Sequence, residues 1–189
     1  GRITALRPLQ VEGVLNRVVG MTLEATPTIV SPAGVAGLRF DDEADTVNAL
    51  VPKLKAEGIE AIVVLIHEGG FASGGINGCT GVSGPIVDIV KRLDPAIDLV
   101  VSGHTHAAYN CLLPNSAGKP VRVTSSGQYG RNLTDIDLVI DTRTRDVVST
   151  TATNIATGTT TAEAAYLTDL VAHYDALAAV PKARPIGVI

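Results

Sequence analysis

Three of the chain's four histidines stand directly after two short apolar runs. His67 follows the run Ala61–Ile66, and His104 and His106 follow the run Ile97–Val101. Neutral imidazole is a common ligand of zinc, manganese and iron ions. The i and i+2 spacing of His104 and His106 suits a turning loop, in which two rings can reach two different metals. The residue types and their spacing therefore predict a metal site.

A single histidine at a strand end is usually an ordinary polar surface residue, so His67 alone would indicate little. A Gly-His-Thr-His motif after one apolar run, with a third histidine after a preceding run, is far more specific. The fourth histidine, His173, lies in a predicted helix without a partner nearby in the sequence. We interpret it as a residue of an amphipathic face.

The elements around these histidines form a strand–loop–helix–strand unit. Both apolar runs are continuous and end at turn signals, which is typical of parallel strands that are covered on both faces. Pro85 opens the helix between them, which extends to Leu93 and begins with proline in the position that a first turn tolerates. Ligands of such sheets bind outside the carboxyl ends of the strands, so all three imidazoles are expected at one edge.

Further elements precede and interrupt this unit. Residues 17–23 predict a buried strand, and Asp41 or Asp42 is expected to cap a helix that runs to Glu57 with a kink at Pro52. The segment from Glu68 to Gly84 holds seven glycines and shows no periodicity. We expect a loop there.

The pattern changes after Asn110, where four short segments rich in β-branched residues predict an antiparallel set. Thr160 and Glu163 predict a capping box for a last helix, which Pro181 and Pro185 end. The four predicted strands are 111–113, 121–125, 133–140 and 147–155. Together the segments predict an α/β fold: a mixed sheet with two or three helices on one face.

Composition excludes several classes of protein. Aromatic residues make up 3% of the chain and the formal charge is −4, so neither a basic groove for nucleic acid nor a stacking surface for bases is indicated. No run of about 18 uncharged apolar residues is present, as a membrane span would require.

The sequence resembles the metallophosphoesterase domain of secreted bacterial 5′-nucleotidases and 2′,3′-cyclic phosphodiesterases. The resemblance covers nearly the whole chain, and it rests on three runs and on the upstream segment VVGMTLEATPTIVSPAGVAGLRF. Its most specific motif is the Gly-His-Thr-His that begins at Gly103. The three runs are IVVLIHEGG, GPIVDIVKRLDPAIDLVVSGHTHAAYN and VTSSGQYGRNLTDIDLVID.

The resemblance implies that His67 and His104 ligate one divalent metal ion, zinc or manganese, and that His106 ligates a second. It also implies a nucleotide substrate and a secreted, periplasmic or cell-surface location. The fold would be about half of a four-layer sandwich: residues 1–158 would form the distal part of the domain, and residues 159–189 a connecting helix toward a nucleotide-binding domain.

Three other motifs of that family do not occur in the chain: Asp-x-His, Gly-Asp and Gly-Asn-His followed by an acidic residue. They supply the bridging carboxylate, an asparagine ligand and the catalytic histidine, so no catalytic residue is assigned here. We therefore expect a fragment of a two-metal phosphoesterase that binds metal weakly and is inactive alone. A metal-binding or interaction module without catalysis is the first alternative, and a domain with purely structural histidines is the second.

Two further expectations follow from this interpretation. Cys79 and Cys111 lie in loops that converge on the same edge, so they form either one disulfide, as in an exported protein, or two free thiols. A sheet that lacks half of its sandwich exposes aliphatic side chains, and large apolar patches are rarely left in water. This predicts a homodimer or a higher oligomer.

Overall fold

The computed structural model describes residues 5–11 and 14–187. The chain divides into two compact units, residues 1–157 and 158–189. No helix in the described part of the chain is long and apolar enough to cross a membrane.

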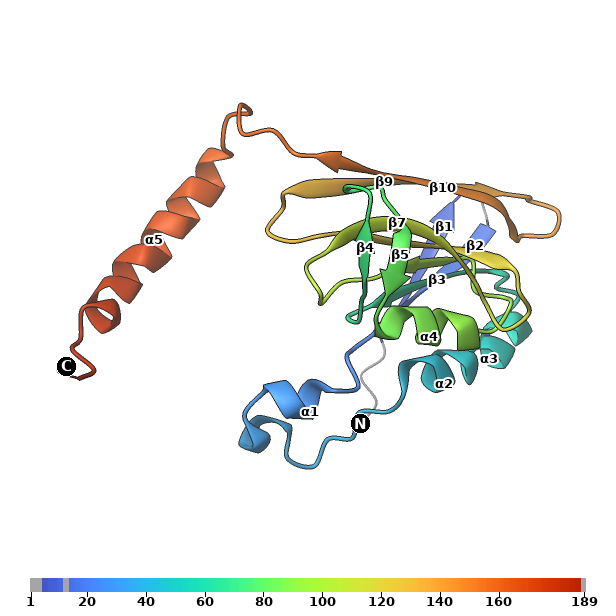
Figure 1. Ribbon diagram of the computed structural model, residues 1–189, viewed down its shortest axis with the longest axis horizontal. Coiled ribbons are helices and arrows are strands. Elements are labelled where there is room, and N and C mark those ends of the chain that lie inside the picture. The colour runs from blue at the N-terminus through green and yellow to red at the C-terminus, as the bar shows by residue number, and fades with distance from the viewer. Residues whose placement is uncertain (1–4, 12–13, 188–189) are drawn as a thin grey trace. The chain divides into compact units, whose positions relative to one another are not determined.

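A six-stranded mixed sheet organises the first unit (Figure 1). Its strand order is β1-β2-β3-β6-β8-β7, in which β2, β3, β6 and β8 run parallel and the two edge strands run antiparallel. The strands are β1 (Ala5–Val11), β2 (Val14–Met21), β3 (Ala61–Ile66), β6 (Leu99–Val101), β7 (Ala108–Pro114) and β8 (Pro120–Ser126). The mixed α/β sheet that the sequence predicts is thus confirmed.

The main core lies between this sheet and helices α2 (Glu43–Asn48), α3 (Val51–Ala56) and α4 (Pro85–Arg92) on one of its faces (Figure 1). Ile62 and Val64 point into this core because alternate residues of a strand face the same side. The opposite face is covered less completely. Leu65, on β3, is 44% exposed there, although the apolar run predicted cover on both faces.

The helix expected from Asp42 to Glu57 is two helices. Asp42 caps α2 as predicted, since its carboxylate accepts a hydrogen bond from Asp45 N at 2.8 Å. Pro52 lies in the first turn of α3 rather than at a kink inside one helix. Proline lacks an N–H and its ring clashes with the carbonyl four residues earlier, so the chain ends one helix and starts another.

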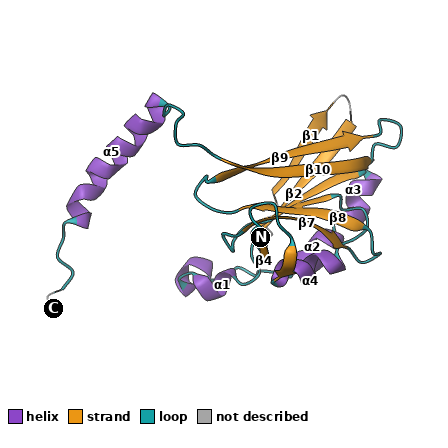
Figure 2. Cartoon of the chain, turned by 45° about the horizontal axis from the view of Figure 1, so that its top comes forward, coloured by secondary structure: helices purple, strands orange, loops and turns teal. Residues whose placement is uncertain are grey.

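Two small antiparallel pairs complete the first unit (Figure 2). Strands β9 (Asn132–Ile140) and β10 (Val147–Ala156) form one pair, and β4 (Phe71–Ser73) and β5 (Thr80–Ser83) form the other. The second pair lies inside the glycine-rich segment, where the sequence predicted only a loop. The predicted antiparallel set is correct for β7–β8 and β9–β10, but β8 also pairs parallel with β6. Two short helices, α1 (Thr26–Ile29) and η1 (Pro32–Val35), lie between β2 and α2.

The second unit contains helix α5 (Ala165–Lys182). The predicted capping box is wrong, because Ala164 is the N-cap and no side chain caps the helix. Glu163 instead accepts a hydrogen bond from the Thr168 hydroxyl at 3.0 Å. Pro181 lies in the last turn, one residue before the helix ends. The apolar side chains of α5 are exposed, and its role as a connector stays a prediction.

Candidate functional site

The carboxyl ends of β3 and β6 bring two of the three predicted ligands together. Val63 pairs with Leu99, so the two parallel strands end side by side. The ring centroids of His67 and His104 lie 5.1 Å apart with the planes at 65°. His106, two residues farther on, has its ring 5.8 Å from that of Tyr129. Among the described residues, the three imidazoles do not form a group whose ligand atoms all lie within 4.8 Å.

The two histidine loops are packed directly against each other. Gly103 N donates to Glu68 O at 3.2 Å, and the Thr105 hydroxyl donates to Gly70 O at 2.8 Å. A Cβ atom on Gly69 would lie 2.1 Å from Gly103 O, whereas a Cβ on Gly103 would find its nearest neighbour, His67 Nδ1, at 3.9 Å. The close approach therefore requires glycine at position 69.

Gly103, in the Gly-His-Thr-His motif, was predicted to matter from the sequence, whereas Gly69 was missed. The signal was the pair Gly69-Gly70 directly after His67-Glu68, in a segment that was predicted only to be a loop. A second glycine contact supports the same arrangement, because a Cβ on Gly70 would lie 2.3 Å from Ser83 O. These glycines hold a tightly packed edge rather than a mobile loop.

Both histidines of the motif have a left-handed backbone, with φ of 65° at His104 and 60° at His106. Thr105 N donates to Gly103 O at 2.7 Å, which closes a three-residue turn around His104. Turns of this kind with positive φ are rare and strained. Residues held in sparsely populated regions cost about 1–3 kcal/mol each and gather at functional sites. The strain supports a functional role for this motif.

Buried hydrogen bonds fix the start of the motif. Ser102 is buried, its hydroxyl is bonded to the Tyr109 hydroxyl, and it donates to Thr124 O at 2.8 Å. Tyr109 is fully buried, and this burial raises the pKa of its phenol. The phenol therefore stays neutral at physiological pH and can anchor Ser102.

A disulfide joins Cys79 and Cys111, with Cα atoms 5.1 Å apart. This confirms the bonded alternative of the sequence analysis. Beside it, Asn77 and Asn154 exchange two hydrogen bonds: Asn77 Nδ2 donates to Asn154 O at 2.8 Å, and Asn154 N donates to Asn77 Oδ1 at 2.7 Å. The amide of Asn154 also donates to Tyr109 O at 3.1 Å. The segment between β4 and β5 is thus tied to β7 and β10.

An acidic group lies at the start of α2. Oxygen atoms of Glu24, Asp42 and Glu43 all lie within 4.8 Å of one another. Asp42 caps α2 and pairs with Arg92 at 2.7 Å, and the Arg92 guanidinium lowers the pKa of Asp42. Glu43 accepts a hydrogen bond from Glu24 N at 2.7 Å, and burial raises its pKa. Asp42 and Glu43 therefore have structural partners, in keeping with the predicted helix start.

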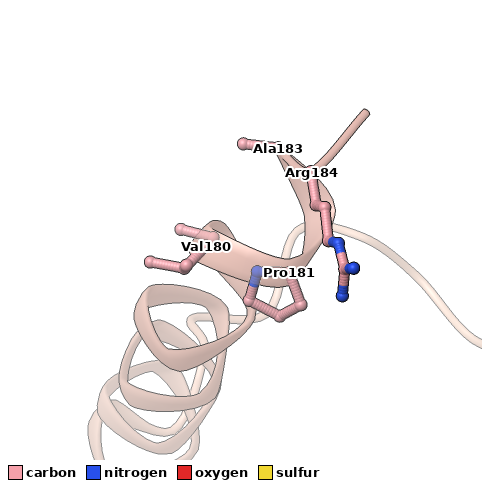
Figure 3. Close-up of a pocket in the computed structure, with 5 residues that line it drawn as sticks. Val180, Pro181, Ala183 and Arg184 are labelled. Carbon is pink, nitrogen blue, oxygen red and sulfur yellow. The ribbon is translucent and has the colours of Figure 1, made fainter. Parts of the chain in front are cut away.

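A hollow on the second unit is lined by other residue types than the histidine loops and the acidic group (Figure 3). It lies at the end of α5 and is lined by Ala179, Val180, Pro181, Ala183 and Arg184. Its lining holds no histidine and no carboxylate. It therefore offers no ligand set for a metal ion.

Solved structures share this architecture. A 5′-nucleotidase precursor from Thermus thermophilus superposes with a TM-score of 0.72 at 20% identity, over 92% of this chain and 34% of that one. The calcineurin-like phosphoesterase YfkN from Bacillus subtilis gives a TM-score of 0.65 at 21% identity, over 95% of this chain and 58% of that one. The chain has the fold of a 5′-nucleotidase-type metallophosphoesterase domain.

Curated proteins are also similar to this chain in sequence. Endonuclease YhcR of Bacillus subtilis is 30% identical over 144 residues, which is 76% of this chain and 11% of the relative. Cell wall protein Lmo0130 of Listeria monocytogenes is 31% identical over 147 residues, 74% of this chain and 18% of the relative. The chain thus spans less than a fifth of either relative. No protein-family model matches it.

Proposed function

We propose that this chain supplies the histidine ligands of a two-metal centre that hydrolyses phosphoesters of nucleosides. The observation that carries the proposal is the pair of His67 and His104, whose rings meet at 5.1 Å where two parallel strands of a metallophosphoesterase fold end. We assign these two rings to one divalent ion and His106 to a second. The names of the relatives, which include an endonuclease and a trifunctional nucleotide phosphoesterase, support a nucleoside phosphoester as the substrate class.

The residues present fit part of such a centre. Imidazoles are good ligands for zinc and manganese, and the left-handed turn at His104 holds one ring beside His67. Two adjacent divalent ions also need anionic charge between them, and the Asp-x-His and Gly-Asp motifs do not occur in the chain. We infer that a bridging carboxylate outside this sequence completes the centre, and that the chain alone binds metal weakly.

In such a centre the ions supply a hydroxide nucleophile near neutral pH and a positive clamp for the phosphate oxygens. The role of this chain is to position ligands. Packing of Gly69 against Gly103 O, together with the Thr105 hydrogen bond to Gly70, fixes the two loops relative to each other. Rigid ligands of this kind lose little freedom when a metal binds.

We also propose an exported location. Disulfides persist in oxidising compartments and are rare in the cytosol, and Cys79 and Cys111 are bonded. One relative is a cell wall protein, which supports the same compartment.

Calorimetry with zinc and with manganese tests the metal site. We expect one weak site that disappears in the variant His104→Ala. The matched control is His173→Ala, in α5 of the second unit, which should bind as the wild type does. With manganese added, hydrolysis of AMP or bis(p-nitrophenyl) phosphate should not exceed the buffer blank. Unchanged zinc binding in His104→Ala would refute the assignment of ligands.

A further inference from the structure

Tyr129 occupies a turn whose backbone suits asparagine or glycine. Arg131 N donates to Gln128 O at 3.1 Å, and the two central residues, Tyr129 and Gly130, have φ of 57° and 65°. Positive φ at both central positions defines a type I′ turn, for which Asn-Gly is strongly preferred. A bulky side chain in the left-handed region is a genuine outlier. Folding alone would therefore not select tyrosine here.

The turn itself is held firmly. Thr157 N donates to Arg131 O at 2.9 Å, and the Thr157 hydroxyl donates to Gly130 O at 2.7 Å. The tyrosine is consequently presented by a backbone that is anchored directly after the strained residue. Its left-handed conformation therefore belongs to a hydrogen-bonded turn.

The ring of Tyr129 is exposed and lies beside a predicted metal ligand. The residue is 80% exposed, so it adds little to any core. Its centroid is 5.8 Å from that of His106, with the planes at 55°, and Arg131 Cζ lies 6.0 Å from the ring. That distance is at the limit of a cation–π contact, which helps to hold an aromatic ring.

We propose that Tyr129 is a specificity-determining residue: its ring stacks against a planar aromatic group of the phosphoester whose phosphate binds at the histidine site. This inference rests on the proposed function and names the class of substrate, an ester that carries a nucleobase or another aromatic ring. Aromatic side chains stack on such rings regardless of base identity. Tyrosine offers a large rigid surface at low entropic cost.

The test compares ligands with and without a ring, in the presence of zinc. Chemical-shift titrations of the ¹⁵N-labelled chain with AMP, phenyl phosphate and ribose 5-phosphate give three affinities for the wild type and for Tyr129→Asn. We expect Tyr129→Asn to bind AMP about tenfold more weakly, as the loss of one stacking contact predicts. Ribose 5-phosphate should bind equally to both proteins. If Tyr129→Asn binds phenyl phosphate and AMP equally more weakly, Tyr129 stacks on any aromatic ring. If only the affinity for AMP falls, Tyr129 stacks on nucleobases.

Two further variants separate stacking from folding. Tyr129→Phe should keep the affinity for AMP. Tyr129→Asn should melt at or above the wild-type temperature, because asparagine suits the turn. The matched control is Arg145→Asn, since Arg145 also has a positive φ, 64°, in the turn between β9 and β10. That variant should bind AMP as the wild type does.

Three results would overturn the inference: wild-type affinity for AMP in Tyr129→Asn, equal loss of AMP and ribose 5-phosphate in that variant, or no shifts with AMP in the wild type. Failure of the proposed function has a different signature, namely zinc binding that persists in His104→Ala. That result is read from the metal titration without any phosphoester present.

Discussion

Polar side chains at the carboxyl ends of the parallel strands have different partners from those at the amino ends. At the carboxyl ends, the rings of His67 and His104 lie 5.1 Å apart, and the backbone of His104 is strained. At the amino ends, Asp98 is buried and satisfied: it accepts from Ile62 N at 3.0 Å and from Lys119 Nζ at 3.1 Å. Both ends belong to the same three strands.

On the proposed function, the difference separates a ligand site from a structural one. Asp98 and Lys119 border a cavity of about 110 Å³ but are already paired with each other, so both charges have structural partners. The carboxyl-end loops are instead held by glycine packing and by hydrogen bonds to backbone carbonyls. Breaking each set of interactions should show this contrast.

The largest effect is expected from the disulfide that ties the segment between β4 and β5 to the middle of β7. Replacing Cys79 and Cys111 together by alanine opens a covalent loop with a sequence separation of 32 residues. Loop-closure entropy predicts a loss of about 3–4 kcal/mol in the free energy of unfolding. Urea denaturation of the double variant measures it, with the reduced wild type as a control that should match. A loss below about 1 kcal/mol would mean that the glycine and asparagine contacts alone hold the segment.

The next largest loss of stability is expected from a glycine substitution that breaks the contact between the histidine loops. Gly69→Ala places a Cβ atom 2.1 Å from Gly103 O, and forced overlap in a packed region costs about 1–3 kcal/mol. Gly103→Ala is the matched control from the other side of the same contact, and it should leave stability nearly unchanged. Equal stability of the two variants would show that the loops are not packed as described.

The smallest expected effect is the pH dependence of stability that Asp98 causes at the amino ends of the strands. Burial raises the pKa of Asp98 to about 6, against the opposing effects of the Ile62 N–H and of Lys119. Because the folded pKa lies above the unfolded value of 3.8, the native state binds the proton more tightly, and Asp98 lowers stability as pH rises from about 4 through 6. The wild type should therefore lose about 1 kcal/mol relative to Asp98→Asn between pH 5 and pH 7.5.

Urea denaturation across that pH range gives the difference directly. Asparagine keeps the acceptor for Ile62 N but cannot ionise, so the pH-dependent part belongs to the carboxyl group. Lys119→Met should shift the loss of stability to higher pH, because the lysine favours the charged carboxylate. A difference that does not change with pH would mean that Asp98 titrates normally.

Sequence reasoning succeeded where the pattern is local. The run Ala61–Ile66 matches β3 at both ends, and proline at the start of α4 marks its first turn. The positions of His67 and His104 followed from the rule that parallel strands end at one edge. Pro52 was misplaced because a proline in a helical pattern can equally kink one helix or begin another, and only the packing of α2 and α3 decides.

The remaining features depend on contacts between distant segments. Gly69 is required by Gly103 O, 34 residues away in the sequence, and Asn154 reaches Asn77 across 77 residues. The periodicity of apolar residues along the sequence does not indicate such contacts. Two expectations stay predictions: the homo-oligomer, and the joint action of the three histidines as ligands. The first depends on a second copy of the chain and the second on metal ions, and neither is part of this chain.

The most direct test of the central claim, that the carboxyl ends carry the metal site, is ¹⁵N NMR of the histidine rings during a zinc titration. Coordination changes the resonance of the ring nitrogen that binds. One ring nitrogen of each of His67 and His104, the pair assigned to one ion, should shift while those of His173 stay in place. Unchanged resonances of both rings, with shifts instead at the backbone amides of Glu24 and Glu43, would contradict the claim and assign metal binding to the acidic group.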